Sequence, residues 1–278
     1  MPLLSIIMAT KDENILFLKK CINSLINQTF QDFQVFVIID SNKDKNFLYL
    51  DSLNNQNDKI NLLINDNKPG VSSSRNYGIV NSQSKYIAIV DSDDFYHPDK
   101  FKKQIMFLED NIRTSVIGTN LYLVSLKDKI IGERTYPELN SEIRKNFLFK
   151  MPIANSSVMF KRNDLNDVGL FDENLNKAED LELWLRFLSH HKEMHNIQEK
   201  LVYYRTPDDE NFKRGREHYR NYFFVMKKHS KSIWPFRLRI VALVFFYIIH
   251  LIPDRYLSIL LKTRIVHYIK KIKSKNIS

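Results

Sequence analysis

Short apolar runs alternate with helix-period stripes in the first third of the chain. The runs at 4–9, 33–39, 60–64 and 86–90 have the length and apolar content of buried strands. Between the first two runs, apolar side chains recur every three or four residues, as in an amphipathic helix: Ile15, Leu18, Cys21, Ile22, Leu25 and Ile26. This order predicts β-α-β units with parallel strands and right-handed crossovers.

The rest of the chain predicts further strands and helices of an α/β protein. Strands are expected over 116–124, 153–160 and 201–204. Helices are expected within 43–59 after a loop, over 100–111 and 141–150, as a short helix over 163–168, and as an amphipathic helix that opens at Glu179. A further helix, capped by Ser72 or Ser73, is expected to run through Ser82. We therefore expect a mostly parallel sheet flanked by helices, with the core domain over residues 1–205 and a second region over 206–278.

Three carboxylates follow the apolar run at 86–90 within four residues, in the order Asp91-Ser92-Asp93-Asp94. Carboxylates this crowded repel one another unless a cation or solvent relieves them. Hard cations such as Mg²⁺ and Mn²⁺ prefer oxygen ligands and share them with substrate phosphates. The cluster fits a metal–diphosphate site, and equally an acidic turn in which Asp94 caps the helix ahead of Pro98.

Other polar residues are predicted to lie at the same edge of the sheet. Thr10 and Asp12 follow the first strand, and Asp40 follows the second. Ligands of parallel α/β sheets bind beyond the carboxyl ends of the strands. This convergence favours the interpretation of residues 91–94 as a binding site.

These motifs, taken in order, resemble those of the family 2 glycosyltransferases, which have the Rossmann-like GT-A fold. The resemblance covers Leu3 to Arg205. It rests on the Thr10–Asp12 loop, Asp40, the segment Ser74-Arg75-Asn76-x-Gly78, the Asp91-x-Asp93-Asp94 cluster, and Glu179-Asp180 followed by Trp184. Lys11 departs from the aromatic residue or proline that family members often carry near this position.

The resemblance implies a nucleotide diphosphate sugar donor, with UDP-sugars favoured, and Mn²⁺ or Mg²⁺ as cofactor. Asp93 is then the expected metal ligand, and Asp91 reaches the metal or the ribose; Asp94 does either, or only caps a helix. Three residues are implied to line the nucleotide pocket, with Asp40 accepting from the uracil imide: Thr10, Asp12 and Asp40. Arg75 is implied to contact the diphosphate or the base, as suits a guanidinium.

The resemblance also implies that Asp180 is the base for the acceptor hydroxyl, with Glu179 orienting its neighbours. A base opposite the leaving group predicts inversion at the anomeric carbon. Acids are also favoured in the first turn of a helix by its dipole, and the two roles are compatible. Many family members carry a metal-site histidine after the strand that ends at Arg205; here Asp208 or Asp209 is the only substitute. The implied acceptor is a hydroxyl of a cell-surface glycan or lipid-linked oligosaccharide precursor.

The net charge of +10 belongs to the C-terminal region. From Arg205 to Ser278 there are 17 Lys/Arg and 5 Asp/Glu, a net of +12, so residues 1–204 carry a net of −2. Residues 240–252 are almost wholly apolar, too short to cross a bilayer, and flanked by basic residues: Arg237, Arg239, Arg255 and Lys262. With the closing Lys270-Lys271-Ile272-Lys273, they predict a helix lying on an anionic membrane surface. A core helix with a solvated basic face, or an oligomer contact, is the alternative.

Two other functions are less compatible with the sequence than sugar transfer. A sugar-phosphate nucleotidyltransferase has a glycine-rich phosphate loop near its N-terminus, and Ala9-Thr10-Lys11-Asp12 has no glycine. Nucleic-acid binding fits the basic tail, but the body of the chain has neither the charge nor a groove-reading motif, so no nucleic-acid partner is expected. One cysteine excludes an intramolecular disulfide, and the N-terminus resembles a strand rather than a signal peptide. We expect a cytoplasmic protein, peripheral on the inner face of the plasma membrane.

Overall fold

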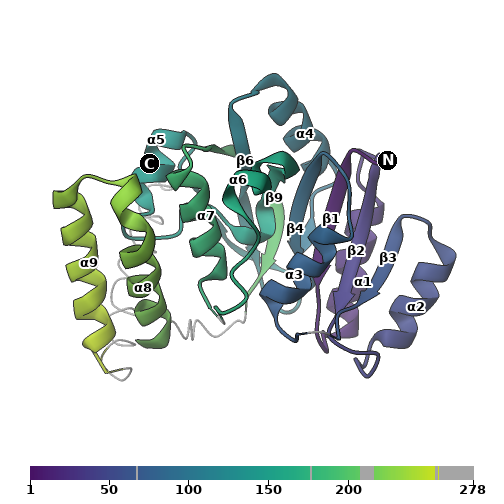
Figure 1. Cartoon of the computed structure of the whole chain (residues 1–278). Coiled ribbons are helices and arrows are strands. Elements are labelled where there is room, and N and C mark those ends of the chain that lie inside the picture. Colours follow the sequence, from purple (N-terminus) through teal and green to yellow (C-terminus); the bar gives the residue numbers. More distant parts are fainter. Residues whose placement is uncertain (67, 176, 207–215, 254–255, 257–278) are drawn as a thin grey trace. The chain divides into compact units, whose positions relative to one another are not determined.

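The computed structural model describes residues 1–66, 68–175, 177–206, 216–253 and 256 (Figure 1). The chain divides into two compact units, Met1–Asp209 and Glu210–Ser278. The boundary predicted after residue 205 falls slightly earlier than this division.

The first half of unit 1 is a run of parallel strands and crossover helices. Its elements are β1 (Leu4–Ala9), α1 (Ile15–Ile26), β2 (Phe33–Ile39), α2 (Phe47–Gln56), β3 (Ile60–Ile64), α3 (Val71–Val80) and β4 (Tyr86–Asp91). The four strands pair in parallel in the order β3-β2-β1-β4. The pattern of apolar residues predicted these four strands and their parallel pairing, but not their order in the sheet.

The second half of unit 1 extends the same sheet. Its elements are β5 (Phe95–Tyr96), α4 (Lys100–Asp110), β6 (Thr114–Val124), β7 (Ile130–Arg134), α5 (Asn140–Asn146), β8 (Met159–Lys161), α6 (Leu165–Val168), α7 (Glu179–Ser189) and β9 (Glu193–Arg205). Beyond β4 the order is β8-β6-β9-β5, with β7 paired to β6. The β6–β9 pair is parallel, and β8 pairs antiparallel with both β4 and β6.

The structure corrects several of the predicted elements. The strand expected over 153–160 is a 3₁₀ turn at Asn155–Ser157 followed by the short β8. The strand expected over 201–204 begins at Glu193, and neither β5 nor β7 was predicted. The polar first half of β9 is extended because β6 pairs with it. This pairing cannot be predicted from the sequence pattern of β9 itself.

The serine cap expected for the helix after residue 70 is also wrong. Helix α3 begins at Val71, with Gly70 as its N-cap at φ 131°, a backbone conformation that favours glycine. The Ser73 and Ser74 hydroxyls instead bond to Asn65 (3.0 Å) and Asp40 (2.8 Å). The serines therefore join α3 to the strand ends rather than cap the helix.

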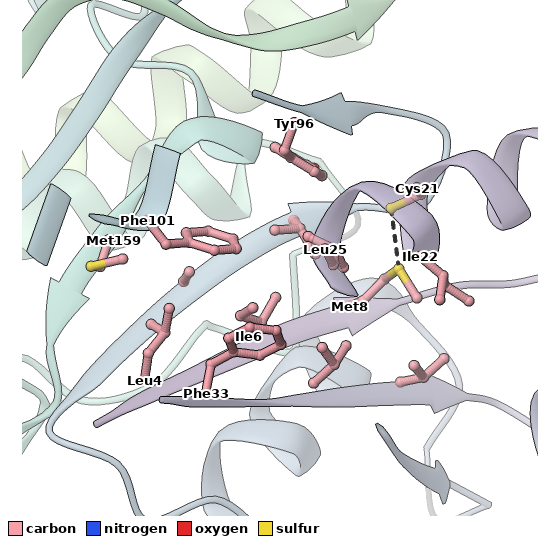
Figure 2. Close-up of a cluster of buried hydrophobic side chains, with 14 of the residues drawn as sticks. Leu4, Ile6, Met8, Cys21, Ile22, Leu25, Phe33, Tyr96, Phe101 and Met159 are labelled. Carbon is pink, nitrogen blue, oxygen red and sulfur yellow. Dashed lines mark hydrogen bonds between the residues drawn. The ribbon is translucent and has the colours of Figure 1, made fainter. Parts of the chain in front are cut away.

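Helices cover both faces of the sheet. On one face, Leu4, Ile6 and Met8 of β1 pack with Cys21, Ile22 and Leu25 of α1 and with Phe101 of α4 (Figure 2). On the other face, α3 approaches so closely that a Cβ at Gly78 would lie 2.5 Å from Ile38 Cδ1 and 3.0 Å from Ile7 Cγ2. This close approach fixes α3 against the strands that end at the site.

Unit 2 contains the helices α8 (Arg216–Ile233) and α9 (Phe236–Leu251), which pack against each other. The Tyr222 and Phe246 rings meet at 5.4 Å, and Ala242 and Phe246 are buried. No helix among the described residues is both long and apolar enough to cross a membrane. The basic positions from 262 to 273, with Arg255, lie outside the described residues.

Candidate active site

The acidic cluster lies at the carboxyl end of β4, where the parallel part of the sheet ends. Asp91 pairs in register with Ala9 of β1. Asp94 is 1% exposed, and its Oδ1 accepts a hydrogen bond from the Arg205 amide at 2.8 Å. The Arg205 Nε donates to the Asp93 carbonyl, also at 2.8 Å. Asp94 therefore joins the β4 turn to the end of β9; it does not cap α4, whose N-cap residue is Asp99.

The cluster holds more negative charge than its surroundings balance. Burial, together with the charges of Asp91 and Glu13, raises the pKa of Asp93 to about 6. Burial and the charges of Asp93 and Asp91 raise the pKa of Asp94 well above its usual range. Glu13, which accepts a long hydrogen bond from the Ser92 hydroxyl at 3.4 Å, was not among the predicted site residues. Its position in a polar loop after the first strand was the only signal for it.

This donor set fits a divalent cation that is shared with a diphosphate. Asp91 and Asp93 supply carboxylate oxygens, and a cation beside them relieves the repulsion that raises the pKa of Asp93. Within the described residues, no three or more His, Cys, Asp or Glu side chains are grouped so as to hold a metal ion. Mg²⁺ is commonly held by one or two carboxylates and the substrate phosphates, so two ligands are sufficient. Asp208 and Asp209 lie outside the described residues.

Thr10 and Asp40 lie at the ends of adjacent strands. The Thr10 amide donates to the Ile38 carbonyl at 2.9 Å, and its buried hydroxyl has no hydrogen-bond partner in the described part of the chain. The Asp40 carboxylate accepts from the Ser74 hydroxyl and lies 3.7 Å from Lys11 Nζ. Both side chains therefore lie at the carboxyl edge of the parallel strands, where ligands of such sheets bind.

Asp12 is held in the loop between β1 and α1. Its backbone is left-handed, with φ 46°. The Asp12 amide donates to Asp44 Oδ2 at 2.7 Å, and the Asp12 carboxylate accepts from the Lys45 amide at 3.2 Å. The residue therefore joins the loops after β1 and β2, and a non-glycine residue in this conformation is commonly part of a functional site.

Arg75 brings the two ends of the predicted site together. Its side chain is buried, with Nη2 3.1 Å from Asp91 Oδ1 and Nη1 3.0 Å from Glu179 Oε1. One guanidinium thus bridges the cluster at the end of β4 and the start of α7. This bridge joins residues 88 positions apart, Asp91 and Glu179, in a single site.

Asp180 lies in the first turn of α7, which is anchored by the fully buried Leu183 and Trp184. The Asp180 carboxylate accepts from the Leu181 amide at 2.7 Å. Burial and the adjacent Glu179 charge raise the pKa of Asp180 to about 7, although the Leu181 amide and Arg75 act to lower it. A carboxyl group with this pKa has the basicity that general-base catalysis near neutral pH requires.

Acidic and basic groups thus gather at the carboxyl edge of a mostly parallel α/β sheet, the edge at which such sheets bind their ligands. Residues 5–163 match the family described as glycosyl transferase family 2, and the chain belongs to that family. The match bears out the predicted glycosyltransferase rather than the nucleotidyltransferase or nucleic-acid-binding alternatives.

Individual relatives agree with this assignment. The chain is 28% identical over 270 residues to an uncharacterised glycosyltransferase of Methanocaldococcus jannaschii, covering 94% of this chain and 93% of the relative. It is 27% identical over 217 residues to the O-antigen biosynthesis glycosyltransferase WbnJ of Escherichia coli, covering 76% and 83%. The structure of S. aureus TarS 1-349 in complex with UDP-GlcNAc superposes with a TM-score of 0.66 at 18% identity, covering 88% of this chain and 71% of that one. The predicted GT-A fold is thereby confirmed.

Proposed function

We propose that this family 2 glycosyltransferase is an inverting, metal-dependent enzyme. It moves a sugar from a nucleotide diphosphate sugar, with UDP-sugars favoured, to a hydroxyl of a cell-surface glycan or lipid-linked oligosaccharide precursor. The observation that carries the proposal is the Arg75 bridge, which sets the acidic cluster of β4 beside a carboxylate pair on α7. Two comparisons support the substrate classes: WbnJ is an O-antigen biosynthesis enzyme, and TarS was solved with UDP-GlcNAc and with UDP.

On the donor side, Asp93 and Asp91 would hold a Mn²⁺ or Mg²⁺ ion. Such an ion, when bound, would stabilise the negative charge that grows on the diphosphate as the glycosidic bond breaks. Asp40 accepts from the base, as its position at the end of β2 permits, and the unpartnered Thr10 hydroxyl is available to the nucleotide. Asp12 holds the loop beside them.

On the acceptor side, the Asp180 carboxylate takes the proton of the attacking hydroxyl. The oxygen of that hydroxyl forms a bond to the anomeric carbon, and the bond from this carbon to the diphosphate breaks. The nucleoside diphosphate leaves with the electron pair, so the configuration inverts in a single displacement. Glu179, held by its ion pair with Arg75, orients the neighbouring Asp180.

The pKa of Asp180 predicts how transfer depends on pH. The base is active only when ionised, so kcat at saturating donor is expected to fall on the acid side with a midpoint near pH 7. Well below the midpoint the decline should approach about tenfold per pH unit. The measurement is initial rate against pH at saturating donor and metal. A rate that stays level from about pH 8 to about pH 5.5 would remove Asp180 as the group that titrates.

We propose further that the C-terminal extension lies on an anionic membrane surface, at the cytoplasmic face of the plasma membrane. Helix α9 exposes eight apolar side chains to between 40% and 66%: Phe236, Leu238, Ile240, Val241, Val244, Tyr247, Ile248 and Leu251. The same two helices carry basic residues: Arg237 and Arg239 on α9 and the exposed Lys227, Lys228 and Lys231 on α8. An apolar face beside basic residues suits the interface of an anionic bilayer.

A single charge on this face is expected to weaken membrane association. Val244 is 50% exposed, so Val244→Glu removes roughly half of the about 1.5–3 kcal/mol that full burial of a valine is worth, and it adds a charge; partitioning into vesicles with anionic lipid should fall at least about tenfold. Ser232→Glu adds the same charge at an exposed position on α8 and is the matched control. Co-sedimentation with vesicles measures both variants. Equal partitioning of the two would argue against α9 as the membrane contact.

The direct test of the proposed activity is a panel of nucleotide diphosphate sugars with the purified full chain and Mn²⁺ or Mg²⁺. Release of the nucleoside diphosphate is followed for each donor. We expect metal-dependent release that is greatest for a UDP-sugar. Release from no member of the panel, or release that an excess of chelator leaves unchanged, would contradict the proposal.

A further inference from the structure

The partners of Arg75 lie within the protein and belong to two separate elements. Its Nη2 bonds to Asp91 at 3.1 Å and its Nη1 to Glu179 at 3.0 Å, and its side chain is 6% exposed. The Nε is buried without a hydrogen-bond partner among the described residues. The two ion pairs hold the guanidinium inside the protein, and its 6% exposure leaves little of it open to an oxyanion from solution.

Asn76, which follows Arg75 on α3, holds the segment that leads into α7. Asn76 Nδ2 donates to the Phe171 carbonyl and to Glu173 Oε1, both at 2.9 Å, and Asn76 Oδ1 accepts from the Phe171 amide at 3.0 Å. The Phe171 ring lies under the Arg75 guanidinium, 5.5 Å from its central carbon. Two adjacent side chains of α3 therefore fasten the approach to α7 and its first turn.

Helix α3 is itself immobilised, because Gly78 packs against Ile38 and Ile7 of the sheet. The base therefore reaches its place through a chain of contacts from the sheet to α3, from Arg75 to Glu179, and from Glu179 to its neighbour Asp180. Asp91, at the other end of the same guanidinium, belongs to the donor side.

We propose that Arg75 is a positioning residue that holds Glu179 and the Asp180 base in register with Asp91, rather than a ligand of the donor diphosphate. This inference rests on the proposed glycosyl transfer. It predicts that losing Arg75 impairs the chemical step far more than donor binding. It also predicts that Arg75 acts through Glu179, so the effects of the two residues overlap.

A double-mutant cycle tests the overlap. Arg75→Gln is expected to lower kcat at least about 30-fold and Glu179→Gln about tenfold, while the double variant falls no further than Arg75→Gln alone. The dissociation constant of UDP with Mn²⁺ should change less than about threefold in all three. Arg75→Gln leaves Glu179 and Asp91 without their partner. Arg75→Lys is therefore included, because lysine keeps the charge but cannot bond to both carboxylates in the geometry of a guanidinium. It should lose about tenfold in kcat with UDP affinity unchanged.

The midpoint on the acid side of the pH dependence of kcat is a second measurement, and a partial loss of folded protein would not shift it. The charges that act on Asp180 are Glu179 and Asp91, which raise its pKa, and Arg75, which lowers it. The midpoint should therefore move to higher pH in Arg75→Gln, to lower pH in Glu179→Gln, and stay in place in Arg75→Lys.

The inference is overturned if kcat effects of Arg75→Gln and Glu179→Gln multiply, or if either Arg75 variant weakens UDP binding by more than about tenfold. The wild-type protein in the same experiments distinguishes a wrong role for Arg75 from a wrong proposed function. If it neither binds UDP nor transfers sugar, the proposed function itself has failed. If it does both and the effects multiply, only the role of Arg75 is wrong.

Discussion

Asp180→Asn is expected to lose sugar transfer by about a thousandfold or more in kcat while UDP binding stays within about threefold of wild type. Asparagine has nearly the same shape but cannot accept a proton. Its side-chain oxygen still accepts from the Leu181 amide, the contact that Asp180 makes at 2.7 Å, so the first turn of α7 is preserved. The loss is therefore chemical rather than structural. Single-turnover rates and calorimetric titration with UDP measure the two quantities separately.

The matched control is Asp167→Asn, which also neutralises a carboxylate but at the surface of α6, where Asp167 pairs with Lys192. We expect this variant to transfer sugar like the wild type. If Asp180→Asn also kept its rate within about threefold of wild type, the base would have to be another group.

Asp93→Asn is expected to lose metal-dependent UDP binding as well as activity. An amide is a weaker ligand for a hard cation than a carboxylate, and Asp93 is the expected direct ligand. In the metal-free protein, by contrast, the same substitution should increase the stability of the fold. Because the folded-state pKa of Asp93 is raised to about 6, its ionised form opposes folding, and this penalty grows as pH rises through that value. At pH 8, without metal, the substitution should raise the free energy of unfolding by up to about 3 kcal/mol, because the pKa of Asp93 rises from 3.8 to about 6 on folding.

Thermal melts of the metal-free protein and UDP titrations with Mn²⁺ test both halves of this prediction. Asp110→Asn, at the exposed end of α4, is the control and should change neither quantity. An Asp93→Asn protein that binds UDP with Mn²⁺ as tightly as wild type would show that the ion is held elsewhere.

The parallel half of the sheet could be predicted because its signals are local. Each strand from β1 to β4 is a short apolar run, and α1 shows its period in its own side chains. The convergence of Thr10, Asp40 and Asp91 followed from the rule that parallel strands end at one edge. The amphipathic pattern after residue 178 placed Glu179 and Asp180 at the start of a helix, but it did not predict what they contact.

The remaining features depend on contacts between distant residues. Arg205 donates to Asp94 across 111 positions, and Glu13 joins the cluster only because the β1 loop folds over it. Arg75 was marked by its motif, but its bridge between Asp91 and Glu179 exists only in the folded chain. The polar half of β9 likewise becomes a strand through its pairing with β6.

We propose that the acidic cluster at the end of β4 binds a nucleoside diphosphate together with a divalent cation. Isothermal titration of the full chain with UDP, in the presence of Mn²⁺ and in the presence of a chelator, measures this binding. We predict saturable binding of one UDP per chain that Mn²⁺ tightens by at least about tenfold. Binding of an oligonucleotide, with no nucleoside diphosphate bound under either condition, would contradict a nucleotide site at this cluster.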